Sequence, residues 1–424
     1  MGVLRHFGVL FQKLSNYSQQ QLAVRLRCFA TTPRHRALKD VVIVSACRTP
    51  VGSFQSSLSS LPATALGSTA IESAVERAGI KPEDVQEVYM GNVVSANLGQ
   101  APTRQAALGA GLRQSTPCTT VNKVCASGLK SIMMASQSLM CNHQQIMVAG
   151  GMESMSNVPY LMERGVTPYG GIQLKDAIVS DGLTDAYDRI HMGVCAEKTA
   201  VDYNISREEQ DQYAIQSYKR TAAAVSNNAL AAEITPVTVT ERKKTKTVDV
   251  DEEYSRLNTE KMATLRAVFK KDGTVTAGNA SKLNDGAAAV VLMTADRANE
   301  LNLKPMAKIL GFADAACAPI DFPIAPALAV PKVLNQCNLR ASNVSYWEIN
   351  EAFSVVVLAN MKELNLPIEK VNVNGGAVSI GHPIGMSGAR LIVHLSHFMK
   401  PGEIGMAAIC NGGGGASALA LQKL

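Results

Sequence analysis

The chain has 424 residues, of which 46% are hydrophobic, so it is long enough to fold into two or more domains with ample cores. No stretch approaches the roughly 20 consecutive apolar residues that a membrane-spanning helix needs. Aromatic residues make up only 5% of the chain, which leaves no stacking platform for nucleic acid. The composition therefore predicts a globular protein that neither spans a membrane nor binds nucleic acid.

The first 39 residues hold seven Lys or Arg side chains and no Asp or Glu, and they account for the whole positive net charge of +6. An Arg-rich, acid-free amphipathic segment is typical of a mitochondrial transit peptide, and it lacks the continuous apolar core of a secretory signal. We therefore expect residues 1–36 to be a transit peptide and the mature protein to lie in the mitochondrial matrix. A retained basic arm is the alternative. In this reducing compartment the nine cysteines are not expected to form structural disulfides.

Residues 37–155 alternate short apolar runs with helical periodicity. This alternation predicts an α/β unit with a mixed, mostly parallel sheet. The expected strands are 41–44, 85–90 and 146–151, and the expected helices are 63–78, 100–108 and 121–140.

Cys125 stands immediately before the buried helical pattern that includes Ile132, Met133 and Leu139. A thiol near a helix N-terminus is expected to favour the thiolate, because that end of the helix is partially positive. Taken alone, Cys125 could equally be a buried structural cysteine, the commonest fate of an intracellular thiol.

Residues 156–275 have a more polar texture and are expected to form an inserted segment. Within it, Ser206-x-x-Glu209 predicts a capping box that opens a helix through Tyr218. Residues 276–300 are expected to complete the first unit.

The alternation returns from about residue 306, so residues 301–424 are expected to form a second unit on the same plan. Direct identity between the halves is weak, and the duplication is inferred from the pattern. The expected strands are 307–312, 345–348 and 405–409, and the expected helices are 325–337, 352–364 and 388–399.

Three further motifs lie in this second half. Asn350 follows an apolar run, where an amide can hold a water or an oxyanion or can cap the next helix. His382 lies between Gly381 and Pro383, in a rigid turn suited to a catalytic base. Cys410 opens a run of glycines from 412 to 415, whose free N–H groups suit an oxyanion hole, although such a run alone could be a flexible turn.

These four segments, in this order, resemble the thiolase family, and most closely its short-chain mitochondrial members. The resemblance runs from about Val41 to Leu424. It implies a thiolase fold: two similar βαβαβ-type halves in a five-layer αβαβα arrangement, with residues 156–275 as a loop domain that binds CoA. It also implies a homotetramer.

The resemblance also implies the catalytic roles. Cys125 would accept the acyl group, His382 would activate it, and Cys410 would be the second, acid/base cysteine. Asn350 would hold an oxyanion-hole water beside His382, and the N–H groups of Cys125 and Gly412 would form a second oxyanion hole.

The implied reaction is the reversible thiolytic cleavage of acetoacetyl-CoA, and of its 2-methyl homologue, in ketone-body and isoleucine metabolism. CoA would be the co-substrate, acetyl-CoA the product, and potassium the one further cofactor. The matching CoA-contact positions are Leu183, Tyr218, Arg256, Lys261 and Ser281. The positions that would shorten the acyl pocket are His191, Met192 and Phe322. The implied potassium ligands are Tyr218, Ala277, Gly278, Ala280 and Val378.

Three alternatives remain at this point. A medium- or long-chain 3-ketoacyl-CoA thiolase of β-oxidation would share the catalytic residues. A decarboxylating ketoacyl synthase would usually carry His or Asn in place of Cys410. A non-catalytic protein with the same fold would not need all four catalytic side chains.

Overall fold

The structure is a computed structural model that describes residues 38–424, apart from 167 and 242–243. The expected transit peptide, residues 1–36, lies outside the described residues. Within the described part of the chain, no helix is long and apolar enough to cross a membrane.

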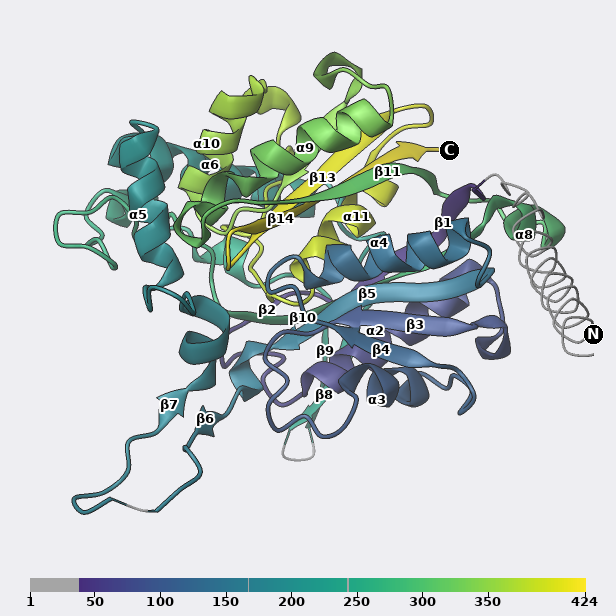
Figure 1. Cartoon of the computed structure of the whole chain (residues 1–424), viewed down its shortest axis with the longest axis horizontal. Helices are drawn as coiled ribbons and strands as arrows, with labels where there is room; N and C mark the ends of the chain where they lie inside the picture. The colour runs from purple at the N-terminus through teal and green to yellow at the C-terminus, as the bar shows by residue number, and fades with distance from the viewer. Residues whose placement is uncertain (1–37, 167, 242–243) are drawn as a thin grey trace, which may run out of the picture. The chain divides into compact units, whose positions relative to one another are not determined.

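The main sheet contains two sets of strands with the same order and the same directions (Figure 1). In the first half the order is β1-β10-β5-β3-β4, where the first two pairings are antiparallel and the next two parallel. In the second half β11-β14-β13-β12 repeats this pattern, and Val371 forms a parallel bridge to Trp347 where the first half has β4. The expected duplication is therefore visible in the topology. The expectation of a mostly parallel sheet was wrong, because six of the nine strand pairings in the main sheet of the described residues are antiparallel. The strands are β1 (Val41–Arg48), β3 (Glu87–Gly91), β4 (Cys118–Val121), β5 (Ile146–Ser154), β10 (Asn284–Thr294), β11 (Ala307–Ala316), β12 (Tyr346–Ile349), β13 (Ile404–Asn411) and β14 (Gly415–Lys423).

The two halves share one continuous sheet, because β1 and β11 pair along a short edge. Val42 lies opposite Lys308, and Ile43 lies opposite Ala307. A short strand, β2 (Gly52–Ser53), pairs with the start of β10.

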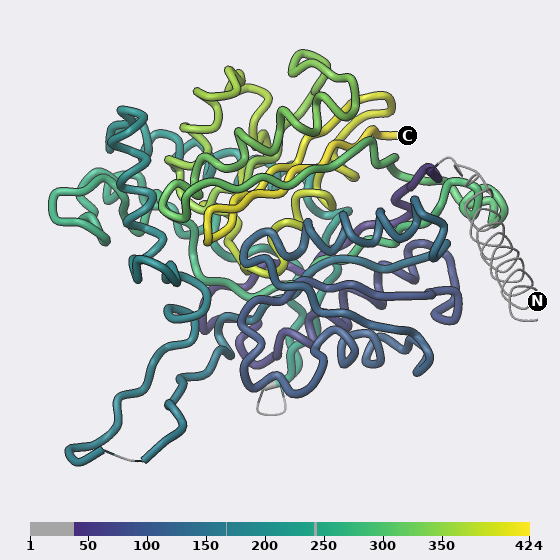
Figure 2. Tube along the Cα trace, in the orientation of Figure 1, coloured from purple at the N-terminus to yellow at the C-terminus, as the bar shows by residue number. Residues whose placement is uncertain are grey.

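Helices cover the sheet in three layers, which confirms the expected five-layer αβαβα arrangement (Figures 1 and 2). The middle layer holds α4 and α11, which pack against each other and against strands of both halves. One outer layer holds α2 and α3, and the other holds α9 and α10. The bounds are α2 (Ala63–Ala78), α3 (Pro102–Gly109), α4 (Ser127–Met140), α9 (Ala325–Gln336), α10 (Ser354–Leu364) and α11 (Ser387–Phe398).

The core between the two halves is built from the facing sides of α4 and α11. Leu129 and Ile132 of α4 are fully buried with Leu391 and Ile392 of α11. Each such side chain contributes about 1.5–3 kcal/mol on burial. The two helices are held firmly, and their N-termini carry the catalytic loops described below.

The inserted segment opens with a long arm and then forms the helices that border the site. The capping box is confirmed: Ser206 Oγ accepts the N–H of Glu209, and the Glu209 carboxylate accepts the N–H of Ser206. The elements are β6 (Tyr160–Leu161), β7 (Lys175–Asp176), α5 (Met192–Asp202), α6 (Arg207–Ser226), β8 (Val237–Glu241), β9 (Lys244–Val248) and α7 (Thr259–Met262), and α8 (Ala295–Glu300) follows β10.

Candidate active site

The turn before Cys125 is strained. Val124 has a φ of 46°, a left-handed conformation that is unfavourable for a β-branched residue. Hydrogen bonds hold it there: its N–H donates to Asn122 Oδ1 at 3.0 Å, and its carbonyl accepts from Ser127 Oγ at 2.6 Å. Such strain costs about 1–3 kcal/mol and is typical of functional sites. It also explains why α4 begins at Ser127 rather than at 121, as the sequence predicted.

Cys125 lies between this turn and the glycine run of the second half. The backbone N–H groups of Gly412 and of Cys125 itself face the thiol, and both act to lower its pKa. Burial acts in the opposite direction and is the larger effect, so the pKa of Cys125 rises to about 12. The expectation of a resting thiolate was therefore wrong: the residue precedes the helix and is surrounded by apolar side chains that disfavour the charge. The thiol needs a base.

His382 is suited to be that base. Its Nδ1 lies 2.6 Å from Ser387 Oγ, and Ser387 Oγ donates its only hydrogen to the carbonyl of Pro383 at 2.9 Å. The serine must then accept from Nδ1, so the ring carries its proton on Nδ1 and leaves a lone pair on Nε2. Nε2 is buried and has no partner among the described residues. Burial lowers the pKa of His382 to about 3, which keeps the ring neutral.

The loop that carries His382 is fixed by side chains of the first half. Gly381 has a φ of 120°, and a Cβ there would lie 2.5 Å from the side chain of Asn284. Asn284 Oδ1 accepts the N–H of His382 at 2.9 Å. Glu153, at the end of β5, accepts the N–H of Gly385 at 3.0 Å. The two halves therefore assemble the site jointly.

Cys410 is the penultimate residue of β13 and is almost fully buried. Gly413 and Gly414, with φ values of 83° and 85°, make the tight turn from β13 into β14. Burial and then the neighbouring Cys125 raise the pKa of Cys410 well above its usual value. Cys410 is therefore a neutral proton donor close to the nucleophile.

Asn350 follows β12 and is completely buried. Its N–H donates to the carbonyl of Ala408 at 3.0 Å, but neither Oδ1 nor Nδ2 has a partner among the described residues. A buried amide without partners is costly unless a ligand or water meets it. The next residue, Glu351, is held by several donors, among them Tyr213 Oη at 2.8 Å and the N–H of Val378 at 2.9 Å.

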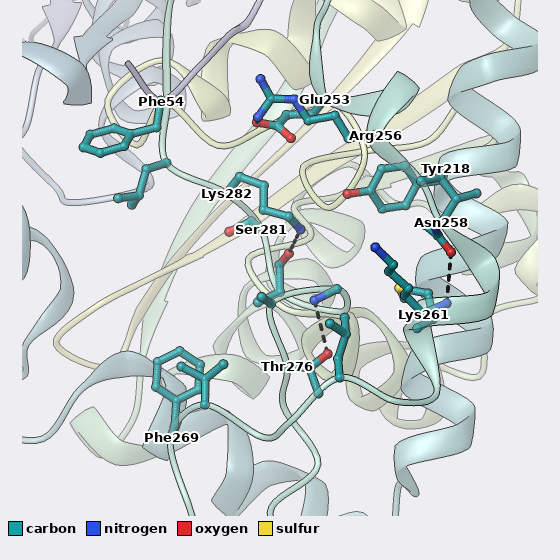
Figure 3. Close-up of a pocket in the computed structure, with 18 residues that line it drawn as sticks. Phe54, Tyr218, Glu253, Arg256, Asn258, Lys261, Phe269, Thr276, Ser281 and Lys282 are labelled. Atoms are coloured by element: carbon teal, nitrogen blue, oxygen red, sulfur yellow. Dashed lines mark hydrogen bonds and ion pairs between the residues drawn. The ribbon is translucent and has the colours of Figure 1, made fainter. Parts of the chain in front are cut away.

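A cavity of about 750 Å³ is lined mainly by residues of the inserted segment and of the stretch 276–283 that follows it (Figure 3). It is lined by seven of the expected CoA or cation positions together with Lys282, Phe269 and Leu283. Leu283 also packs into the apolar cluster that includes Cys125, so this wall connects the cavity with the nucleophile. The side chains of Arg256, Lys261 and Lys282 make the rim positive, as a phosphate-bearing ligand requires. The expected positions along the cavity are Tyr218, Arg256, Lys261, Ser281 and the backbone of Ala277, Gly278 and Ala280.

The residues expected to shorten the acyl pocket lie near Cys410. Met192 and Phe322 share its apolar cluster. His191 stacks on Phe269 with ring centroids 4.7 Å apart, and its Nδ1 accepts the N–H of Gly193 as the cap of α5. Leu183 lies in the cluster with Cys125.

The expected potassium position fits an ion only in part. Tyr218 and Val378 pack in one buried cluster, and the backbone of Ala280 lies on the same cavity wall as Tyr218. The carbonyl of Ala280, however, already accepts a hydrogen bond from Lys282 Nζ at 2.6 Å. An oxygen that is needed as a metal ligand is thus occupied by an amine of the chain itself.

Sequence reasoning missed four residues that shape the site. Ser387 and Asn284 fix the His382 ring and loop, Glu153 fixes Gly385, and Lys282 occupies the cavity wall. Ser387 is five positions after His382, and this spacing could have indicated that a turn of the chain brings its hydroxyl back to the His382 ring. Asn284 and Glu153 are distant from His382 in sequence and gave no such signal, and Lys282 was missed although it directly follows Ser281.

Comparisons with known proteins agree with this geometry. The chain matches the thiolase N-terminal domain over residues 41–296 and the thiolase C-terminal domain over residues 303–423. It is 61% identical to the mitochondrial acetyl-CoA acetyltransferase of Mus musculus (98% of each chain) and 62% identical to that of Homo sapiens (96% of this chain, 95% of the relative). The crystal structure of Acat5 thiolase from Ascaris suum in complex with coenzyme A superposes with a TM-score of 0.89 at 48% identity, covering 91% of this chain and all of that one. The chain belongs to the thiolase family.

Proposed function

We propose that this protein is an acetyl-CoA acetyltransferase that cleaves acetoacetyl-CoA with CoA, reversibly, to give two molecules of acetyl-CoA. The observation that carries this proposal is that the Cys125 thiol lies close to Cys410 and shares an apolar cluster with Ile384 of the His382 loop, in a chain 61–62% identical to acetyl-CoA acetyltransferases. His382 Nε2 has no partner among the described residues. Cleavage by a long-chain 3-ketoacyl-CoA thiolase is not favoured by these relatives.

In the first step, His382 Nε2 takes the proton of Cys125, and the thiolate attacks the keto carbon of acetoacetyl-CoA. The bond between that carbon and C2 then breaks. The electron pair leaves on the acetyl-CoA fragment as an enolate, which takes a proton from Cys410 and departs as acetyl-CoA. Cys410 is buried and neutral, as a proton donor must be.

In the second step, the thiol of free CoA gives its proton to the Cys410 thiolate and attacks acetyl-Cys125. Acetyl-CoA forms, the Cys125 thiolate leaves, and it recovers the proton from His382. Cys125, His382 and Cys410 all end in their starting protonation states, with the thiol proton of CoA replacing the proton that Cys410 gave to the enolate. In the synthetic direction Cys410 removes the α-proton of acetyl-CoA.

Negative charge develops on two oxygens, and we propose one hydrogen-bonding site for each. The N–H groups of Cys125 and Gly412 are suited to the oxygen of the group bonded to Cys125, since both face the thiol. Asn350, through a water, and His382 are suited to the enolate oxygen, since both polar side-chain atoms of Asn350 and Nε2 of His382 have no partners in the described chain. The loss of one such donor typically costs about 10²–10³ in rate.

We propose CoA as co-substrate in the cavity of Figure 3, with Arg256 and Lys261 near its phosphates and Tyr218 and Ser281 along its length. Leu183, in the apolar cluster with Cys125, would contact the end of CoA that reaches the nucleophile. The loop domain of residues 156–275 supplies most of these contacts. Met192 and Phe322 close the acyl pocket beside Cys410, which favours acetoacetyl-CoA and its 2-methyl homologue over long chains.

Two finer expectations stay predictions for this chain. The potassium ion, with Tyr218, Ala277, Gly278, Ala280 and Val378 as ligands, has to compete with Lys282 for the carbonyl of Ala280. A homotetramer is supported by the arm between β6 and β7, whose apolar side chains are exposed; light scattering of the purified protein would measure its mass. The exposed apolar residues of the arm are Tyr160, Met162, Val166, Ile172 and Leu174.

The protein is mitochondrial, because the relatives that it matches are mitochondrial acetyl-CoA acetyltransferases. The basic segment at residues 1–36, which has no acidic side chain, agrees with this location.

The test is a comparison of thiolysis rates for acetoacetyl-CoA, 2-methylacetoacetyl-CoA and 3-ketohexadecanoyl-CoA. Fast cleavage of the two short substrates is expected. Cleavage mainly of the sixteen-carbon substrate would overturn the substrate assignment and leave the catalytic residues in place.

A further inference from the structure

Lys282 lies on the wall of the CoA cavity, in the same segment as Ala280, and this segment packs against the catalytic segment that carries Asn350. The N–H of Ser281 donates to the carbonyl of Ala352 at 3.0 Å, and Ala280 forms a bridge with Phe353. These contacts bring the Lys282 side chain close to the carboxylate of Glu351. Glu351 directly follows Asn350 in the sequence. A change in the charge of Lys282 would therefore be felt close to the Asn350 amide, which is proposed to serve the oxyanion.

The amine of Lys282 has the surroundings of a bound cation. Lys282 Nζ donates to the carbonyl of Ala280 at 2.6 Å and lies 5.8 Å from the ring centroid of Tyr218. Burial lowers the pKa of Lys282 to about 8, and the carboxylates of Glu253 and Glu351 oppose this effect by favouring the positive charge. Figure 3 shows the Tyr218 hydroxyl pointing toward the Lys282 side chain. A carbonyl oxygen, a phenol and nearby carboxylates are hard donors that suit a small cation or an ammonium group equally well.

We propose that the ammonium group of Lys282 is the resident cation of this site and takes the place of a potassium ion, so that the protein works without added potassium. A potassium ion that used the Ala280 carbonyl would have to displace the amine and would be repelled by it at close range. The inference rests on the proposed function for its link to CoA turnover, but the position of the amine does not depend on that function.

The placement also gives Lys282 a role as a positioning residue. The N–H of Val378 donates to Glu351 Oε2, and Val378 packs against Tyr218. The positive charge of Lys282 attracts the Glu351 carboxylate. This attraction connects the cavity wall with the segment that carries Asn350. Removing the charge is expected to loosen this connection unless another cation replaces it.

The test compares the wild type with three variants in potassium chloride and in choline chloride at equal ionic strength. Lys282→Thr removes the amine and frees the Ala280 carbonyl. Lys282→Met removes the charge but keeps most of the volume. Lys304→Thr is the matched control, because Lys304 is exposed and makes no hydrogen bond or ion pair with the described residues. Both the midpoint of thermal unfolding and the rate of acetoacetyl-CoA cleavage are measured.

The wild type and Lys304→Thr are expected to give the same midpoint and rate in both salts. Lys282→Thr is expected to lose activity in choline and to regain it with potassium, with a saturable rise in its unfolding midpoint. Lys282→Met is expected to lose activity without rescue. A potassium-dependent midpoint in the wild type would overturn the proposal. The proposal would also be overturned if the rate and the unfolding midpoint of Lys282→Thr did not respond to potassium while its KM for CoA was raised. The amine would then be a contact to the phosphates of CoA.

A second measurement holds even if Lys282→Thr does not fold. Crystals of the wild type soaked in rubidium chloride are expected to show no anomalous peak between Tyr218 Oη and the Ala280 carbonyl. A peak there would overturn the proposal. These readouts need no turnover, so a protein that failed to cleave acetoacetyl-CoA would refute the proposed function without deciding the question of the cation.

Discussion

Ser387 Oγ accepts the Nδ1–H of His382 at 2.6 Å while it donates its own hydrogen to the carbonyl of Pro383. This pair of bonds selects the tautomer of the neutral imidazole that carries its proton on Nδ1. Nε2 therefore keeps its lone pair, and it has no partner among the described residues. The base is thus prepared by a residue one turn further along the chain, at the start of α11. No carboxylate is needed to orient the ring.

Replacing Ser387 by Ala removes this acceptor and allows the other tautomer, in which Nε2 carries the proton and cannot serve as a base. We expect acetylation of Cys125 to slow by about 10–100-fold, the loss that is typical when a metal-bound histidine loses its orienting partner. Single-turnover acetylation by acetyl-CoA measures this, and a change in its pH profile distinguishes tautomer loss from a general loosening. Ser396→Ala is the control, because Ser396 is buried in the same helix and its hydroxyl bonds only the Ile392 carbonyl among the described residues. Equal losses in both variants would contradict the role of Ser387.

The thiol of Cys125 is expected to react as an unactivated thiol when no substrate is bound. Burial raises its pKa to about 12, and His382, with a pKa of about 3, is neutral and cannot form an ion pair with it. The thiolate fraction then grows roughly tenfold per pH unit across the range from 7 to 10. Alkylation of Cys125 by iodoacetamide, followed by peptide mass spectrometry, should show a rate that keeps rising through this range. A rate that is already constant below pH 7 would indicate a thiolate–imidazolium pair instead.

Much of the fold could be predicted because its strands and helices alternate in clear apolar runs, as in β1 and α2. The strands β10 and β14 were not predicted, because they are rich in Ala and Gly, which have low strand propensity and enter the sheet here by burial on both faces. The catalytic cysteines and the histidine were found through their neighbours in sequence. Glu153 and Asn284 could not be found in that way, since they act across the interface between the halves and only the fold brings them to the His382 loop.

The two cysteines are expected to separate the two chemical steps. Cys125→Ser should abolish both the acyl-enzyme and turnover, since a serine hydroxyl is a far weaker nucleophile than a thiol. Cys410→Ala should still acetylate Cys125 from acetyl-CoA but fail to exchange the α-protons of acetyl-CoA with solvent or to form the C–C bond. Mass spectrometry of the intact protein and deuterium exchange into acetyl-CoA read the two steps separately. Normal turnover of Cys410→Ala would show that another group supplies the proton.

Asn350→Ala removes an amide whose two polar atoms have no partner in the described chain. If the amide serves the oxyanion, kcat should fall by about 10²–10³ while KM for CoA changes little. Stability should not fall, because the amide makes no side-chain bond that the variant would break. Steady-state kinetics and thermal unfolding of the same preparation check both statements. A lower unfolding midpoint with kcat unchanged would mean that the amide is structural.

Arg48 connects the end of β1 with two carboxylates of the inserted segment, and all three side chains are buried. Its guanidinium lies 2.7 Å from Glu233 and 2.7 Å from Asp251. Arg48→Met leaves both carboxylates without this partner, so we expect a loss of about 3–5 kcal/mol in unfolding free energy. Arg297→Met, which breaks the more exposed pair with Glu300, should cost about 1 kcal/mol or less.

The pH dependence of the Arg48→Met variant gives a second check with a definite sign. Arg48 and His394 hold the pKa of Glu233 below its usual value despite burial, so this carboxylate stabilises the wild type above the ordinary Glu pKa and loses that contribution as the pH falls below it. The variant lacks the Arg48 part of this effect, so its unfolding midpoint should rise less between pH 4 and pH 7 than that of the wild type. Parallel profiles for the two proteins would show that Arg48 acts through packing rather than through charge.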